Sequence, residues 1–263
     1  MRPRFRLAAI LLLALAGPSL ACGPESLGTR RVLAVETAGG VRVGTKSYPA
    51  TLPLADKEVV LTFDDGPWPG TTQAVLDSLA RECVRATFFL IGENAEARPA
   101  LVRRMIADGH TVGHHTWSHP ILSKIPAADA LGEIERGIAA DDRAAYGSAA
   151  PVPRVAFFRF PGFADTPELL DRLAERKIAV FGADLWASDW KPMTPQAQLD
   201  LVMKRLNETG RGIVLFHDTK RQTADMLPAF LRALKDGGYA VVHIIPAHPQ
   251  AGRSLYRSLS AGD

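Results

Sequence analysis

The feature that most constrains the fold of this chain is a regular alternation of strand-like and helix-like segments between residues 59 and 244. Short runs rich in β-branched and aromatic residues alternate with longer runs whose apolar residues recur at helical spacing. This alternation predicts an α/β fold in which parallel strands are joined and covered by helices. The expected strands are 59–63, 86–91, 111–113, 155–160, 179–182, 212–216 and 239–244, and the expected helices are 72–82, 98–108, 127–143, 167–176, 195–207 and 223–235.

About seven strands fit either a barrel or an open doubly wound sheet, and the pattern alone leaves both open. Two helix starts carry a clear local signal, because Thr166 and Thr194 each precede a proline. A threonine N-cap followed by proline at the first helical position is typical of a helix start.

The N-terminal residues have the layout of a secretory signal peptide. Arg2, Arg4 and Arg6 precede an apolar run at 7–16, and a small-residue stretch at 19–21 follows it. The apolar run is too short to cross a bilayer, and no later stretch is a better candidate for a membrane span. We therefore expect residues 1–21 to be removed and the protein to be exported, either to a periplasm or to the medium.

The two flanks of the alternating region show weak periodicity. We interpret residues 22–55 as a linker and irregular N-terminal segment with one short strand at 32–35, and residues 247–263 as a C-terminal tail.

The net charge of the chain depends on whether the leader is removed, because the leader holds three of the 31 Lys and Arg residues and none of the 28 acids. The remaining chain would be near neutral, which argues against a nucleic-acid partner.

The chain has two cysteines, Cys22 and Cys83. Cys22 directly follows the small-residue stretch, which admits a lipoprotein with an acylated Cys22, although Ser19 stands where such signals usually carry leucine. Cys83 lies in an apolar helical stretch and is most simply a small core residue. A Cys22–Cys83 disulfide would suit an oxidising compartment, so the sequence leaves acylated, free and paired states open.

Two consecutive carboxylates, Asp64 and Asp65, close the first expected strand and are followed by Gly66-Pro67. Neighbouring side chains on a strand point to opposite faces, but at a strand end that turns into a loop both can reach one cleft. Carboxylates this close repel unless a cation or a proton separates them. The same stretch is also typical of a solvated turn.

Histidines gather after a second strand, since four of the seven lie between residues 110 and 119. His115 and His119 are four residues apart, a spacing that suits two imidazoles on one metal ion. Both the carboxylates and these histidines follow strands, so they should share the rim where α/β folds place their sites. Two histidines and one aspartate with an open position form a catalytic zinc-type ligand set. We expect His110 and His114 to serve local packing.

Three further strand ends carry polar and aromatic residues. Arg159 lies among phenylalanines at 158–163, and at the rim it would hold a carboxylate in one orientation. Asp184, Asp189 and two tryptophans occupy 182–190, and His217 ends the strand at 212–216. All four tryptophans sit beside these clusters, and flat rings with a polar handle suit sugar rings. The tryptophans are Trp68, Trp117, Trp186 and Trp190.

The ordered motifs Thr62-Phe63-Asp64-Asp65-Gly66-Pro67, His115-Thr116-Trp117-Ser118-His119, Arg159-Phe160-Pro161, Asp189-Trp190 and Leu215-Phe216-His217 resemble those of the polysaccharide deacetylase family. This family is also called the NodB homology domain or carbohydrate esterase family 4. The resemblance covers residues 56–246 and implies a distorted (β/α) barrel. It implies an enzyme that removes N-acetyl groups from the sugars of peptidoglycan, a chitin-like oligomer or an exported polysaccharide.

The resemblance also implies a role for each motif residue. Asp65, His115 and His119 would bind a divalent metal, most simply Zn²⁺, with Co²⁺, Mn²⁺ or Ni²⁺ as alternatives. Asp64 would be the general base and Arg159 would orient it, whereas His217 would be the general acid and Asp189 would tune it. The acetyl pocket would be lined by Trp190 and Leu215, and the substrate rim by Gly162 and Phe163.

Two departures from the family pattern bear on substrate preference. An aromatic residue usually follows the proline of the third motif, but here Gly162 stands in that position and Phe163 comes next. Trp186 stands where an aspartate is common. The rival interpretations are a cyclic amide or imide hydrolase on the same barrel and a cell-wall-binding protein without turnover. The complete acid, base and ligand set disfavours the second of these. The oligomeric state is left open.

Overall fold

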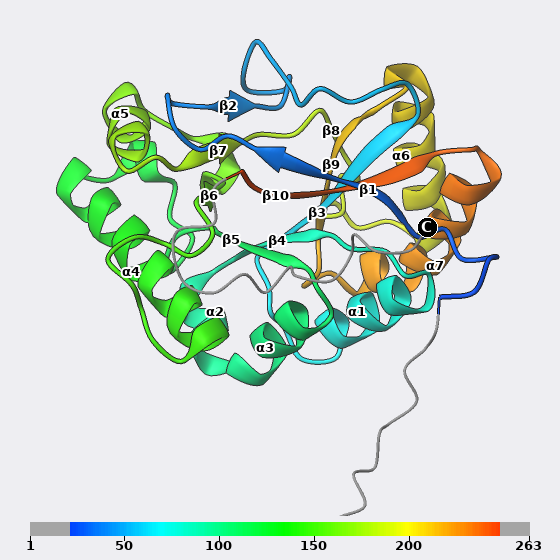
Figure 1. Ribbon diagram of the computed structural model, residues 1–263, viewed down its shortest axis with the longest axis horizontal. Helices are drawn as coiled ribbons and strands as arrows, with labels where there is room; N and C mark the ends of the chain where they lie inside the picture. Colours follow the sequence, from blue (N-terminus) through cyan, green and yellow to red (C-terminus); the bar gives the residue numbers. More distant parts are fainter. Residues whose placement is uncertain (1–21, 248–263) are drawn as a thin grey trace, which may run out of the picture.

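The computed structural model describes residues 22–247 and forms an α/β fold built on parallel strands (Figure 1). The predicted leader at 1–21 and almost all of the predicted tail lie outside the described residues. The strands are β1 (Thr29–Val35), β2 (Arg42–Val43), β3 (Glu58–Asp64), β4 (Thr87–Leu90), β5 (Thr111–His114), β6 (Phe157–Phe158), β7 (Ala179–Phe181), β8 (Leu185–Trp186), β9 (Gly212–His217) and β10 (Ala240–Pro246).

Every ladder between these strands is parallel, as the alternation of elements predicts. Strand β3 is the junction of the sheet: it pairs with β10 at its start, with β4 at its end and with β9 along most of its length. A continuous run of strands follows the order β8-β9-β3-β4-β5-β6-β7-β2. Within residues 22–247 no ladder joins β8 to β2, so this barrel-like run is open at that point.

In Figure 1 the helices lie to the left of, below and to the right of the strands, and β2 with loops lies along the upper side. They are α1 (Thr71–Arg81), α2 (Gly92–Ala97), α3 (Pro99–Ala107), α4 (Ala127–Tyr146), α5 (Pro167–Glu175), α6 (Pro195–Thr209) and α7 (Arg221–Asp236). The Thr166 and Thr194 hydroxyls accept hydrogen bonds from Leu169 N–H and Ala197 N–H, so both expected N-caps are confirmed. No helix in the described part of the chain combines the length and apolar character that crossing a membrane requires.

The main core lies between the sheet and helices α1, α3, α6 and α7. Apolar side chains of β3, β4 and β9 fill it, and three of them are phenylalanines that stack: Phe63 lies 5.1 Å from Phe88 and 5.5 Å from Phe216 between ring centroids. Burying such aromatic side chains contributes a few kcal/mol each. This rigid base fixes the ends of β3 and β9, where candidate site residues stand.

Residues 22–55 were predicted to be a linker with one short strand at 32–35. That strand is present as part of β1, which is seven residues long and pairs with β10. The two-residue strands β2, which pairs with β7, and β8 were not predicted. The exposed residues that alternate along β1 weaken its apolar signal, and two-residue strands such as β2 carry no periodicity.

The two cysteines form a disulfide, with the Cα atoms 5.8 Å apart. The prediction of Cys83 as a small core residue was wrong, because it follows the end of α1 and is only half-buried. The bond ties the start of the described chain to α1, and Thr29 N–H donates a hydrogen bond to the Cys83 carbonyl. The Cys22 sulfur in this form is not available for acylation.

Candidate active site

Five strand ends deliver the predicted site residues to one rim of the sheet. Strand β3 ends at Asp64, β5 leads to His115 and His119, β6 to Arg159, β8 to Asp189, and β9 ends at His217. Because all the ladders are parallel, the carboxyl ends of these strands lie together. In register, Asp64 pairs with His217 across β3 and β9, and His114 pairs with Phe158 across β5 and β6.

The two consecutive aspartates face the same histidine because the backbone turns between them. Asp64 is the last residue of β3, and Asp65 has a φ of 76°, in the left-handed region that aspartate tolerates. Asp64 Oδ2 lies 3.8 Å and Asp65 Oδ1 lies 3.6 Å from the same atom, His115 Nε2. The two carboxylates therefore converge on one histidine, and Asp64 is buried rather than solvated.

Asp65, His115 and His119 place three ligand-type atoms within 4.8 Å of one another. His119 Nε2 lies 3.4 Å from Asp65 Oδ1, and this oxygen is buried without a hydrogen-bond partner among the described residues. A buried carboxylate oxygen costs free energy unless it is paired, so a cation between these atoms would satisfy it. The residues fit a divalent metal with two imidazole ligands and one carboxylate.

His115 is oriented so that one ring nitrogen faces the aspartates. Its Nδ1–H donates to the Arg159 carbonyl at 2.6 Å, which leaves the Nε2 lone pair toward Asp65. Burial lowers the pKa of His115 to about 3, against the raising effect of Asp65, so the ring is neutral. A neutral ring with a fixed tautomer is the form in which histidine binds a metal.

The loop that carries His119 is held by two helices. Thr116 and His119 have φ values of 70° and 64°, conformations that non-glycine residues keep only when the surroundings impose them. The backbone N–H groups of Gly92 and Glu93, at the start of α2, donate to the carbonyls of Thr116 and Trp117.

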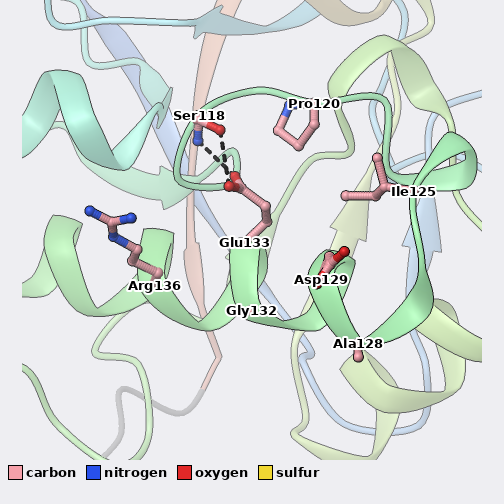
Figure 2. Close-up of a pocket in the computed structure, with 8 residues that line it drawn as sticks. All are labelled: Ser118, Pro120, Ile125, Ala128, Asp129, Gly132, Glu133 and Arg136. Carbon is pink, nitrogen blue, oxygen red and sulfur yellow. Dashed lines mark hydrogen bonds between the residues drawn. The ribbon is translucent and has the colours of Figure 1, made fainter.

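Glu133 of α4 fastens the same loop from the other side. Its carboxylate accepts hydrogen bonds from Ser118 N–H at 2.8 Å and Ser118 Oγ at 2.9 Å, as the dashed lines of Figure 2 show. The groove between this loop and α4 has a volume of about 460 Å³. It is lined by Ser118, Pro120, Ile125, Ala128, Asp129, Gly132, Glu133 and Arg136 and contains none of the predicted site residues.

Arg159 is fully buried beneath Asp64. Its Nη1–H donates to Asp64 Oδ1 at 2.7 Å and to Thr62 Oγ1 at 2.9 Å, and Nη2 donates to the Gly182 carbonyl. Burial raises the pKa of Asp64, and the charge and hydrogen bond of Arg159 offset part of that effect. The arginine thus fixes one carboxylate oxygen and leaves Oδ2 toward His115 Nε2.

His217 and Asp189 form a second pair on the same rim. Asp189 Oδ1 lies 2.7 Å from His217 Nδ1, and Asp189 Oδ2 accepts hydrogen bonds from His217 N–H and Thr223 Oγ1–H. Burial acts to lower the pKa of His217, but the hydrogen bond and charge of Asp189, with Asp65 and Asp64, raise it to about 9. His217 is therefore protonated at neutral pH, and its Nε2 lies 4.0 Å from Asp65 Oδ2.

Aromatic rings extend from His217 along the rim. The Trp190 ring lies edge-on to His217 at 5.9 Å, Trp186 lies 6.0 Å from Trp190, and Phe163 stacks on Trp186 at 6.2 Å. Leu215 is buried on β9 and is the register partner of Trp186. Gly162 is exposed with a φ of 59°, and a Cβ there would lie 3.0 Å from Ile121. The four predicted substrate-side residues are thus at this rim.

Sequence reasoning missed the groups beneath the rim. Asp218 is buried, accepts a hydrogen bond from Thr72 Oγ1, and lies so close to Gly66 that any Cβ there would collide with its carboxylate. Burial raises the pKa of Asp218 to about 7. Helix α2 was also missed, although Asn94 donates to the Asp65 carbonyl at 2.9 Å. The one signal in the sequence for Asp218 was its position directly after His217.

Comparison with known proteins agrees with this geometry. The family model for polysaccharide deacetylase matches residues 52–181. The chain is 33% identical over 189 residues to peptidoglycan-N-acetylmuramic acid deacetylase PdaC of Bacillus subtilis, a match that spans 72% of this chain and 38% of the relative. It thus covers about two-fifths of the length of that relative and of the Listeria monocytogenes deacetylase PgdA.

A shorter relative is covered almost completely. The chain is 35% identical over 196 residues to a chitooligosaccharide deacetylase of Sinorhizobium fredii, and the match covers 70% of this chain and 88% of the relative. Among solved structures, the Bdellovibrio bacteriovorus peptidoglycan deacetylase Bd3279 superposes with a TM-score of 0.75 at 30% identity, over 86% of this chain and 62% of that chain. These relatives are named as deacetylases, which hydrolyse amide bonds. The chain belongs to the polysaccharide deacetylase family.

Proposed function

We propose that this protein is a metal-dependent N-deacetylase that removes acetyl groups from the N-acetylated sugars of a polysaccharide. The observation that carries the proposal is the convergence of Asp65 Oδ1 with the Nε2 atoms of His115 and His119, beside a second carboxylate and a protonated histidine. Mixed imidazole and carboxylate ligands favour Zn²⁺, with Co²⁺, Mn²⁺ or Ni²⁺ as alternatives. When bound, such an ion would polarise the acetamide carbonyl and activate water.

The remaining roles follow from charge and geometry. Burial raises the pKa of Asp64. Its Oδ2 atom accepts the proton of the attacking water, because Oδ1 is held by Arg159. His217 carries a proton at neutral pH and donates it to the departing amine, which is too poor a leaving group as an anion. Asp189 keeps the His217 tautomer fixed through Nδ1.

The substrate side of the proposal rests on the aromatic rings and on the named relatives. Trp190 and Leu215 would enclose the acetyl methyl group, and Gly162 and Phe163 would contact the sugar. Peptidoglycan is the first candidate polymer, and chitin-like oligomers are the second, because relatives of both kinds match. A peptidoglycan substrate would require the export that the leader-like residues 1–21 predict.

A single experiment tests the function. Acetate release is measured from N-acetylated peptidoglycan fragments and chitin oligomers, and ring opening is measured for a cyclic imide, before and after chelation and after adding back Zn²⁺ or Co²⁺. We expect release from the glycans alone, loss on chelation and recovery with metal. Full activity in a verified metal-free sample, or hydrolysis of only the imide, would overturn the proposal.

A further inference from the structure

Trp68 is exposed at the rim without a role in the chemistry described above. Trp68 and Trp190, each 46% exposed, are the two aromatic side chains exposed among residues 22–247. Trp190 adjoins His217, whereas Trp68 lies three residues beyond Asp65, a span of at most about 11 Å. In the sheet, β9 with His217 separates β3, which precedes Trp68, from β8, which precedes Trp190. In the strand order the two exposed rings therefore follow the strands on either side of the one that carries His217.

The Trp68 ring is fixed rather than free. Prolines at 67 and 69 restrict the backbone on both sides, and Trp68 N–H donates to Thr72 Oγ1 at 2.7 Å. The Arg98 guanidinium lies 4.6 Å from the ring centroid. A ring held in this way is a preorganised platform, which loses little conformational entropy when a sugar stacks on it.

Arg98 is tied to the metal side of the site but carries an unbalanced charge. Its Nη1–H donates to Asn94 Oδ1 at 3.2 Å, and Asn94 in turn donates to the Asp65 carbonyl. Asn94 is neutral, and no carboxylate among residues 22–247 forms an ion pair with Arg98. By contrast, Arg104 on the following helix pairs with both Asp77 and Asp108.

We propose that Trp68 and Arg98 form a subsite for a sugar that carries a carboxylate, next to the sugar that loses its acetyl group. The indole supplies a stacking face and the guanidinium supplies a forked donor for the carboxylate. The preferred substrate is then an acidic N-acetylated glycan rather than a neutral one. This inference rests on the proposed deacetylase function and specifies its substrate class.

The test uses three trisaccharides of N-acetylglucosamine type: a neutral one, one with a lactyl ether carboxylate, and one with a uronic acid at one position. Their binding is measured by calorimetry in the full chain with Asp64→Asn, so that turnover does not consume them. Their kcat/KM is measured by acetate release in the otherwise unchanged chain. Arg98→Gln and Trp68→Ala are compared with Arg103→Gln, which removes the same charge from an exposed position on α3.

We expect Arg98→Gln to weaken binding of the carboxylate-bearing sugars about fivefold, through KM, and to weaken the neutral sugar much less, because the neutral sugar loses only the help of Arg98 in holding the Trp68 ring. Trp68→Ala should weaken all three about tenfold, without changing hydrolysis of a small activated acetate ester. Comparing the losses for the lactyl ether and the uronic acid trisaccharides shows which of the two carboxylates Arg98 binds. Equal effects of Arg98→Gln on neutral and acidic sugars, or no effect of Trp68→Ala, would overturn the subsite. Selective binding without acetate release would overturn the proposed function and leave the subsite standing.

Discussion

Two neighbouring histidines, His114 and His115, each lie beside a pair of consecutive aspartates, yet the two regions differ in kind. His115 faces Asp64-Asp65 at the rim, and His114 faces Asp141, the first of two consecutive aspartates on α4, in the interior. His114 Nδ1 lies 2.8 Å from Asp141 Oδ2, and its Nε2–H donates to the Val155 carbonyl at 3.0 Å. Both ring nitrogens of His114 are thus satisfied by the protein.

Burial disfavours charge on both members of the interior pair. Because a carbonyl can only accept, Nε2 of His114 carries the proton, and a neutral ring then requires Asp141 to donate to Nδ1. Burial lowers the pKa of His114 to about 4, and burial together with Asp142 raises the pKa of Asp141 well above its ordinary value. At the rim, by contrast, Asp65 Oδ1 and two Nε2 atoms converge, and Asp65 Oδ1 has no hydrogen-bond partner among the described residues. Residue type alone therefore does not separate a structural His–Asp pair from a ligand set; the number of unpaired atoms that converge does.

The largest effects should come from replacing the rim aspartates. Asp65→Asn removes an anionic ligand, so metal content and activity should fall together, with partial rescue by excess metal. Asp64→Asn leaves the three ligands in place but removes the base, so metal should stay near stoichiometric while turnover falls by roughly 10²–10⁴-fold. Elemental analysis beside deacetylation rates measures both.

The interior supplies the matched control. The amide of Asp141→Asn can donate a hydrogen bond to His114 Nδ1, so metal content and turnover should stay close to those of the unchanged chain. If Asp141→Asn loses metal as Asp65→Asn does, the two regions do not differ as argued. Swapped outcomes for Asp64 and Asp65 would exchange their roles.

A smaller and more selective effect is expected at His217. His217→Ala should keep metal and fold but lose amide hydrolysis, because the amine leaves only with a proton. An activated ester, whose leaving group needs none, should lose much less. The ratio of the two rates measures the acid role, and equal losses on both substrates would refute it.

The sequence predicted the rim better than the interior, for physical reasons. Site residues follow strands with strong apolar signals, so predicting β3 and β9 also predicts that Asp64 and His217 lie at their carboxyl ends. Asp141 and Asp142 lie on a correctly predicted helix, but acids on a helix are expected to face water, and nothing in the pattern marks them as buried. Short elements such as α2 and β8 are stabilised mainly by tertiary contacts, so their presence was not predictable from the sequence. The hydrogen bonds from α2 to the backbone carbonyls of Asp65 and Thr116 were not predictable for the same reason.

The smallest effect concerns how the interior histidines link stability to pH. Burial lowers the pKa of His110 and of His243 to about 3, and that of His114 to about 4. The pKa of a histidine in the unfolded chain is about 6.5. As the pH is lowered below this value, the unfolded chain binds protons that the folded chain does not, so the free energy of unfolding should decrease. Asp141 acts in the opposite sense, because its raised pKa makes the folded chain bind the extra proton.

His110→Asn isolates one of these groups. Its Nδ1 accepts Ala86 N–H at 3.1 Å, a bond that an asparagine oxygen can replace without titrating. Urea unfolding of chelated protein between pH 7.5 and 4 should then show a dependence on pH that is shallower by up to about 1.4 kcal/mol per unit. Asp141→Asn should make the loss toward pH 4 steeper, since the stabilising proton uptake of the folded chain disappears. If the free energy of unfolding depends on pH equally in all three proteins, then these buried groups have the same pKa in the folded and unfolded chains. Burial in the interior would then not shift their pKa values as argued.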